Sequence, residues 1–170
     1  MKRKGENMFD IKLKVKKYLL RKKGVRIGDG VDIGKNVNFG SEPYLIEIAD
    51  NVRISANVNF ITHDGGLWTL RKMKLLENAD FFGKIIVEEN VNIGMNATIM
   101  PGVKIGKNSI IGFGAIVTKN VEPNTVVAGI PARKIETIQE YYEKKKNKCD
   151  FTKNMKYKDK KEYLLKKKFI

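Results

Sequence analysis

Large apolar residues recur at every sixth position over much of the chain. Two short series come first, one of Ile27, Ile33 and Phe39 and one of Ile48, Ile54 and Phe60. The longest unbroken series follows them and consists of Val87, Ile93, Ile99, Ile105, Ile111 and Val117. A small residue follows most of them directly, as Gly94 follows Ile93. A second small residue stands four positions after the apolar residue, as Ala97 does after Ile93. A six-residue period fits neither a strand's alternation nor a helix's 3.6-residue turn. It is the hexapeptide signature of a parallel β-helix.

This period predicts an all-β domain over about residues 27 to 122. Each hexapeptide supplies one short strand with its large apolar side chain pointing inward, and then a turn. Three such sides close one coil of a prism, whose backbone groups pair with the coils above and below. The core is then a stack of aliphatic side chains. Because a thin prism buries less surface than a globule of the same length, we expect it to form oligomers.

Two of the repeats carry a resemblance to a known family. Ile-Gly-Lys-Asn-Val-Asn at 33–38 and Ile-Gly-Lys-Asn-Ser-Ile at 105–110 resemble the repeats of the hexapeptide-repeat acyltransferase superfamily. The resemblance implies a left-handed parallel β-helix, although left-handed crossovers are rare in proteins. We expect this acyltransferase domain at 25–135, with short, basic helical extensions at 1–24 and 136–170.

The six-residue period is interrupted twice. Phe39 and Ile48 are nine residues apart, which predicts a small bulge at a corner around 41–43. Phe60 and Val87 are 27 residues apart, with no repeat between them. We therefore expect a loop at 62–83 that leaves the prism, and such insertions often carry function. This loop contains the only histidine and the only tryptophan of the chain.

His63 is the candidate catalytic base. A lone histidine is usually structural, but this one stands three residues after the inward Phe60 and beside two glycines. Acyl transfer from a thioester needs a base to take the proton of the attacking group, and histidine suits this role at neutral pH. The segment 61–66 also resembles the catalytic-histidine segment of sugar and polysaccharide O-acetyltransferases. Its spacing departs from that of the galactoside and maltose acetyltransferases, so their acceptors are not assumed.

Four further residues are weaker candidates for the acceptor side of the site. Asp64 could hold the imidazole tautomer or be an ordinary turn aspartate. Trp68 could stack on a sugar or anchor the loop on a neighbouring subunit. Asn38 could bind an acceptor hydroxyl, and Arg71 could pair with an acceptor phosphate.

The second half of the chain carries the cofactor resemblance. Residues 91–103 and 111–125 resemble the coenzyme A-binding coils of the superfamily, and 128–133 is similar to its Gly-x-Pro-Ala-Arg element. This implies that Met95 and Phe113 lie along the pantetheine arm, although most members have smaller residues there. It also implies cofactor-binding residues near the nucleotide end, where cations meet phosphates: Thr118, Lys119, Pro131 and Arg133. Alternatively, Lys119 and Arg133 are solvated charges at the end of the prism that bind no cofactor.

The net charge of +15 lies mostly at the two ends of the chain. A solvated lysine-rich surface is the simplest interpretation. Nucleic acid is the generic partner of such runs, but no base-reading motif accompanies them, so it is disfavoured. Peripheral contact with an anionic membrane would also account for the charge, and so would attraction of anionic substrates.

The single cysteine, Cys149, lies among lysines and indicates a reducing compartment. The N-terminal lysines exclude a signal-peptide core, and no apolar stretch approaches the length of a membrane span. We therefore expect a cytoplasmic protein, with peripheral contact at the inner face of the membrane left open.

The sequence thus predicts a homotrimer that transfers an acyl group, acetyl from acetyl-CoA, to a hydroxyl of a cell-surface saccharide or its precursor. His63 would act as general base, with direct transfer, no metal and no covalent intermediate. One alternative is an N-acetyltransferase acting on a nucleotide-linked amino sugar. Another, of a different class, is a non-catalytic scaffold that binds membrane or nucleic acid, and measuring coenzyme A binding separates it from the enzymes.

Overall fold

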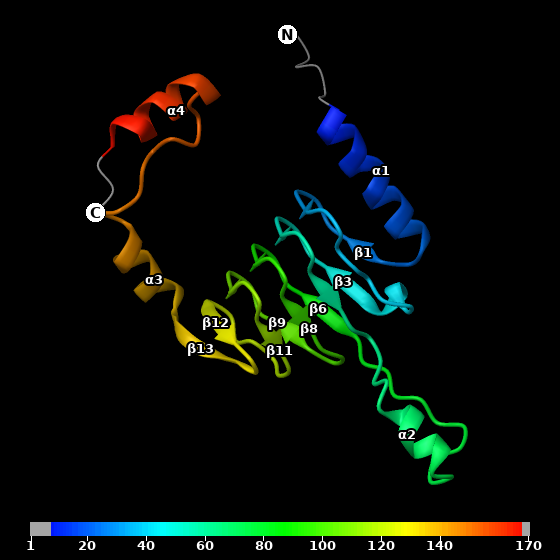
Figure 1. Cartoon of the computed structure of the whole chain (residues 1–170). Helices are drawn as coiled ribbons and strands as arrows, with labels where there is room; N and C mark the ends of the chain where they lie inside the picture. The colour runs from blue at the N-terminus through cyan, green and yellow to red at the C-terminus, as the bar shows by residue number, and fades with distance from the viewer. Residues whose placement is uncertain (1–7, 168–170) are drawn as a thin grey trace.

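The computed structural model describes residues 8–167 and consists of a solenoid of short strands with helices at both ends and in one loop (Figure 1). The strands are β1 (Arg26–Ile27), β2 (Asp32–Ile33), β3 (Ile46–Ile48), β4 (Arg53–Ile54), β5 (Asn59–Phe60), β6 (Ile85–Val87), β7 (Asn92–Ile93), β8 (Thr98–Ile99), β9 (Lys104–Ile105), β10 (Ile110–Ile111), β11 (Ile116–Val117), β12 (Thr125–Gly129) and β13 (Ala132–Thr137). The helices are α1 (Met8–Lys22), α2 (Leu67–Lys72), α3 (Ile138–Lys145) and α4 (Tyr157–Lys166). The all-β class therefore describes the solenoid alone.

Successive coils stack into three sheets, which form the faces of the solenoid. Sheet A has the order β1-β3-β6-β9, sheet B has the order β13-β12-β10-β7-β4-β2, and sheet C has the order β11-β8-β5. Pairing between coils is parallel throughout these sheets, and only the terminal hairpin β12–β13 is antiparallel. The predicted stack of parallel strands is confirmed.

The six-residue period places one apolar residue of each coil on each sheet. On sheet B, Ile33, Ile54, Ile93 and Ile111 pair in register and are at most 4% exposed. On the face that sheet C forms, the rings of Phe39, beside an isolated parallel bridge, and Phe60 stack with their centroids 5.3 Å apart. Burial of these columns supplies the main stabilising term of the solenoid.

The small residue after each inward residue permits close stacking of the coils. A Cβ added to Gly94 would lie 2.6 Å from the Phe113 backbone nitrogen. The third residue after the inward one, to which the sequence pattern assigned no role, is commonly an asparagine with positive φ, as at Asn90, Asn108 and Asn124. The Asn108 amide accepts a hydrogen bond from Asn90 and donates one to Asn124, each at 2.9 Å. Asparagine suits this turn because it tolerates the left-handed conformation and bonds its neighbours.

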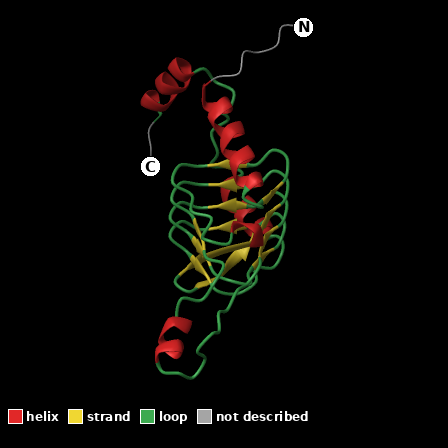
Figure 2. Cartoon of the chain, turned by 90° about the vertical axis from the view of Figure 1, so that its right-hand side faces the viewer, coloured by secondary structure: helices red, strands yellow, loops and turns green. Residues whose placement is uncertain are grey.

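Both interruptions of the period produce irregular structure at one corner. The shorter contains a 3₁₀ turn, Pro43–Leu45. The longer leaves the solenoid as a projecting arm that carries α2 (Figures 1 and 2). An antiparallel bridge between His63 and Phe82 closes the base of this arm. The arm is therefore attached at the histidine.

The terminal helices lie outside the sheets. Helix α1 crosses the first coil (Figure 2). Its Leu13 and Leu20 pack against the core, and an Arg21 Nη donates to the Ile27 carbonyl at 2.7 Å. Helix α3 begins at a capping box formed by Thr137 and Glu140. Within residues 8–167, no helix combines the length and the apolar character needed to cross a membrane.

Candidate active site

His63 lies at the edge where the chain passes from sheet C to sheet A, which we call the C–A edge. It follows β5, the sheet C strand of the second coil. On the first coil the same edge carries Ser41 and Glu42, and on the fourth coil, after β11, it carries Thr118 and Lys119. Residues 21 positions apart are stacked neighbours on the first two coils, as in the pairs Arg26–Glu47, Asp32–Arg53 and Asn38–Asn59. Glu42 and His63 are also 21 positions apart, so this register places them together.

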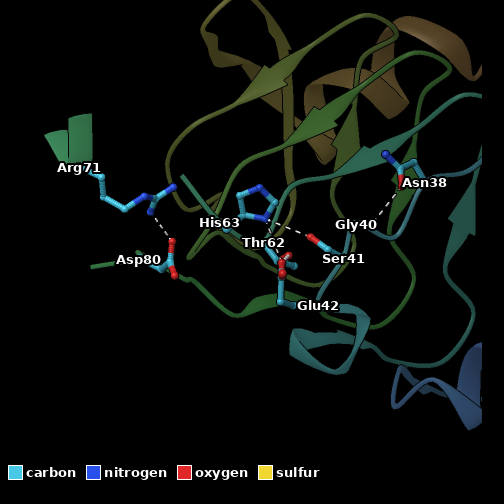
Figure 3. A network of polar contacts seen from close by, with 8 residues as sticks. All are labelled: Asn38, Gly40, Ser41, Glu42, Thr62, His63, Arg71 and Asp80. Atoms are coloured by element: carbon cyan, nitrogen blue, oxygen red, sulfur yellow. Dashed lines mark hydrogen bonds and ion pairs between the residues drawn. The ribbon is translucent and has the colours of Figure 1, made fainter. Parts of the chain in front are cut away.

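A carboxylate holds the imidazole of His63 (Figure 3). The Nδ1 atom lies 2.9 Å from Glu42 Oε2 and 3.4 Å from Ser41 Oγ. The same Glu42 oxygen accepts a hydrogen bond from Thr62 Oγ1 at 2.7 Å, and Thr62 is fully buried. When Nδ1 donates to a carboxylate, the ring carries its basic lone pair on Nε2. The pair therefore has the arrangement of an oriented general base.

Glu42 is held in its ionised form. The hydrogen bond from Thr62, followed by the one from His63, lowers the pKa of the Glu42 carboxyl to about 2, against its burial. Its side chain is 16% exposed, whereas that of His63 is 43% exposed. The carboxylate is thus shielded behind a histidine that solvent and substrate can reach.

Of the two roles that the sequence leaves open for Asp64, the structure shows the turn aspartate and not the partner of His63. Asp64 Oδ1 accepts a hydrogen bond from the Gly66 backbone nitrogen at 2.8 Å and so forms a local turn. The carboxylate on Nδ1 belongs to Glu42, which the sequence pattern did not reveal as a site residue. The 21-residue offset between the first two coils was the signal that could have found it.

A cavity of about 430 Å³ opens beside the imidazole. It is lined by residues of both interruptions: Ser41, Glu42, His63, Asp64, Gly65, Trp68, Arg71, Asp80 and Phe82. The structure thereby brings Trp68 and Arg71 together with His63, as a common site requires. Trp68 is 60% exposed, and the Phe82 ring lies edge-on to His63 with centroids 6.4 Å apart.

Two of the predicted acceptor residues have other partners. Arg71 Nη1 donates to Asp80 Oδ1 at 2.5 Å and to the Ala79 carbonyl at 2.7 Å, so its charge is matched and it ties α2 to the returning chain (Figure 3). The predicted pairing of Arg71 with an acceptor phosphate stays a prediction, and in this structure the side chain forms this internal ion pair. Asn38 lies outside the lining residues, and its Oδ1 accepts from the Gly40 nitrogen at 3.0 Å, which fixes a positive-φ turn.

The predicted cofactor residues fall into two groups. Met95 and Phe113 follow β7 and β10 of sheet B, so they lie at the edge between sheets B and C, the B–C edge. They belong to neighbouring coils, joined by a hydrogen bond from the Gly114 nitrogen to the Met95 carbonyl at 2.7 Å, and their side chains are 50% and 83% exposed. On a single chain, this group lies on a different edge from His63.

The second group lies at the C-terminal end of the solenoid. Lys119 and Arg133 line one cavity of about 250 Å³ between the β11 turn and the β12–β13 hairpin. Thr118, beside Lys119, is exposed. Pro131, exposed and joined to Ile130 by a cis peptide bond, forms the hairpin turn. Two cations are thus placed where phosphate groups could bind.

Known proteins resemble the chain in both sequence and structure. Residues 84–119 match the family described as "Bacterial transferase hexapeptide (six repeats)". Protein CapG of Staphylococcus aureus is 42% identical over 151 residues, which cover 87% of this chain and 86% of that protein. The chain belongs to the hexapeptide-repeat acyltransferase superfamily. The galactoside O-acetyltransferase of Escherichia coli strain K12 is 40% identical over 120 residues, covering 66% of this chain and 57% of that enzyme.

A solved structure agrees with this assignment. The hexapeptide-repeat-containing acetyltransferase VCA0836 from Vibrio cholerae superposes with a TM-score of 0.59 and 32% identity, covering 68% of this chain and 63% of that one. The predicted superfamily and the predicted enzyme class, acyltransferase, are confirmed. The chain spans little more than half of the galactoside O-acetyltransferase, so the substrates of this hexapeptide-repeat acyltransferase are a matter of proposal.

Proposed function

We propose that this protein transfers an acetyl group from acetyl-CoA to a hydroxyl of a cell-surface saccharide or its precursor. The observation that carries the proposal is the Glu42–His63 pair, which faces a cavity of about 430 Å³ at the C–A edge. Membership of an acyltransferase superfamily supports a thioester donor. An oriented imidazole supplies the base that such a transfer needs.

The chemistry follows from the two ring nitrogens of His63. Nε2 takes the proton of the acceptor hydroxyl as the oxygen attacks the thioester carbonyl. The tetrahedral intermediate then collapses, the carbon–sulfur bond breaks, and the imidazolium returns the proton to the departing thiolate. Glu42 is a positioning residue, because its carboxylate orients the ring through Nδ1 and offsets the positive charge that the ring gains in between.

The cavity suits a polyhydroxylated acceptor. The exposed Trp68 ring offers an apolar face on which a sugar can stack, and Ser41 and Asp80 place oxygen acceptors around the cavity. Because Arg71 is already matched by Asp80, an acceptor phosphate is not required here. A galactoside is the acceptor named for one of the similar proteins, which supports a saccharide.

We further propose that the active enzyme is a homotrimer of left-handed coils. The superfamily resemblance supports the handedness. The trimer is supported by the separation of Met95 and Phe113 from His63 on one chain, since a neighbour that supplies its B–C edge would complete the cleft. Lys119 and Arg133 would then bind phosphates of coenzyme A at the far end of the same cleft.

The division into a catalytic domain at 25–135 and basic extensions at 1–24 and 136–170 is retained in this proposal. Its setting is the cytoplasm, because the single cysteine, Cys149, is exposed and a reducing compartment keeps such a thiol free.

Release of coenzyme A thiol tests the proposed function. The purified chain is incubated with acetyl-CoA and a panel of sugars, glycans, nucleotide sugars and amino sugars. We expect thiol release with a hydroxyl acceptor and a product whose acetyl group is removed by mild alkali, as an ester is. An alkali-stable amide would identify the N-acetyltransferase alternative. Failure to bind coenzyme A in a calorimetric titration would support the scaffold and overturn the proposal.

A further inference from the structure

Helix α1 has two faces of different character. Its inner face lies on the first coil, where Leu13 and Leu20 pack against the core and Lys16 Nζ donates to the Gly34 carbonyl at 2.7 Å. Burial of Lys17 on this face lowers the pKa of its ammonium, against the opposing charges of Asp29 and Asp32 on the same coil. The helix thus covers the end of the solenoid and is its outermost element there (Figures 1 and 2).

The outer face of α1 is an apolar stripe. Ile11, Val15, Tyr18 and Leu19 are 50%, 53%, 59% and 54% exposed. Their spacing, at positions i, i+4, i+7 and i+8, places them on one side of the helix, opposite Leu13 and Leu20. An exposed stripe of four large hydrophobic side chains on one helix is characteristic of an interaction surface.

Basic residues border this stripe. At 100° per residue, Lys12 and Lys23 follow one side of it, Lys14 follows the other, and Lys22 continues it at the end of the helix, whereas Arg21 bonds the Ile27 carbonyl. Residues 8–23 contain seven Lys or Arg and a single acidic residue, Asp10. A helix with an apolar face flanked by cations is the pattern of a segment that lies in the plane of an anionic bilayer surface.

We propose that the outer face of α1 binds the surface of an anionic lipid bilayer. The apolar stripe enters the interface, and the flanking cations meet the headgroups. Nucleic acid fits this surface less well, because the apolar stripe occupies the middle of the face, where a phosphate backbone needs cations. In a cyclic trimer all three α1 helices share one end, so the surface is presented three times.

The docked orientation has a consequence for the acceptor. His63 lies on the second coil from α1, and coils stack at about 4.8 Å. The helix axis stands about 10 Å from the first coil, and one further coil spacing places His63 roughly 15 Å from the level of the helix axis. This geometry favours a saccharide acceptor anchored in the membrane. The choice of acceptor rests on the proposed function, whereas the binding surface does not.

Flotation with vesicles tests the surface on the full-length chain. Wild type should float with vesicles of phosphatidylglycerol and phosphatidylcholine but not with pure phosphatidylcholine, and high salt should weaken the binding. The triple variant I11Q/V15Q/L19Q should lose about tenfold or more in partition. Glutamine keeps helix propensity, so α1 itself is preserved. The matched control F151Q/L165Q changes two exposed hydrophobic residues outside α1 (91% and 76% exposed) and should bind as wild type does.

A fluorescent probe provides a measurement that does not depend on the triple variant. An environment-sensitive dye attached at V15C in the C149S background should shift to the blue on addition of the anionic vesicles. The same dye on the native Cys149 should shift little. An unshifted V15C probe, or equal flotation of the triple variant and wild type, would overturn the proposal.

Different occupants of the stripe give distinct outcomes. A drop in oligomer size of the triple variant, with no vesicle binding by wild type, would assign the stripe to a second copy of this chain. If wild type binds a random oligonucleotide more tightly than the vesicles, and the triple variant binds the oligonucleotide equally well, the cations would be assigned to nucleic acid. Either result contradicts the membrane surface. Vesicle binding is measured without acetyl-CoA, so a failure of the proposed acyl transfer would leave these results unchanged.

Discussion

Glu42 and His63 meet because one comes from each interruption of the repeat, at the same corner of adjacent coils. The carboxylate serves two donors, Thr62 Oγ1 at 2.7 Å and His63 Nδ1 at 2.9 Å. A histidine held in this way keeps one ring orientation and loses less entropy in the transition state. The proposed catalysis therefore depends on a side chain that acts through the imidazole.

The first prediction concerns this positioning. Glu42→Gln should lower kcat by roughly tenfold to a hundredfold with little change in either KM, because the carboxylate supports a charge that the ring carries only during the reaction. Steady-state kinetics of thiol release measures both constants. Asp64→Asn is the matched control and should stay close to wild type, since the Asp64 carboxylate bonds the Gly66 nitrogen rather than the imidazole. Equal losses in the two variants would contradict the assignment of Glu42.

The second prediction follows from the low pKa of Glu42. The carboxyl has a pKa of about 2 in the folded chain and an ordinary value of 4.5. As the pH falls from 4.5 toward 2, the unfolded state takes up a proton that the folded state refuses, so this contribution to stability is lost in that window. Thermal melts at a series of pH values should show a smaller loss for Glu42→Gln than for wild type. Parallel losses in both proteins would show that Glu42 is not stabilised by its neighbours.

At the scale of elements, regular repetition determines what the sequence could predict. The apolar period located the strands, the core columns and both interruptions, because each hexapeptide is one strand and one turn. The contacts within the arm were beyond reach, since its 27-residue interval has no repeat to fix a register. Arg71 therefore looked free, whereas Asp80 is its partner. Helix α2 likewise has too few residues for a clear period.

The third prediction concerns the cavity between the β11 turn and the β12–β13 hairpin. Lys119→Ala and Arg133→Ala should each raise the KM for acetyl-CoA about threefold to tenfold while the acceptor KM stays nearly fixed, because both line the cavity proposed for the cofactor phosphates. Lys107→Ala, on a turn between sheets A and B, is the matched control. A weaker acceptor with unchanged acetyl-CoA would place these cations in the acceptor site instead.

At the scale of the whole molecule, one solenoid contains two incomplete half-sites. The C–A edge carries His63, whereas Met95 and Phe113 lie on the B–C edge. In the proposed trimer, three copies around an axis would bring each C–A edge against a neighbour's B–C edge. This assembly would complete the site, and it would also cover faces of a thin core.

The fourth prediction concerns this assembly. Light scattering should give about three times the chain mass of 19.4 kDa. Co-refolding His63→Ala with Phe113→Asp should restore part of the activity that each variant lacks alone, because mixed trimers contain some cleft with both intact edges. A fully active monomer, or an absence of any recovery in mixed trimers, would contradict the shared cleft.

The central claim is that His63 removes the acceptor proton, and acetyl transfer by His63→Ala tests it most directly. The measurement is the rate of thiol release from acetyl-CoA at a saturating concentration of acceptor, for the variant and for wild type. The variant is first shown to bind coenzyme A as wild type does and to have the same oligomer size. We expect kcat to fall by about a hundredfold or more, the size of the effect of a lost general base. Turnover by the folded, assembled variant at a rate near that of wild type would contradict the account.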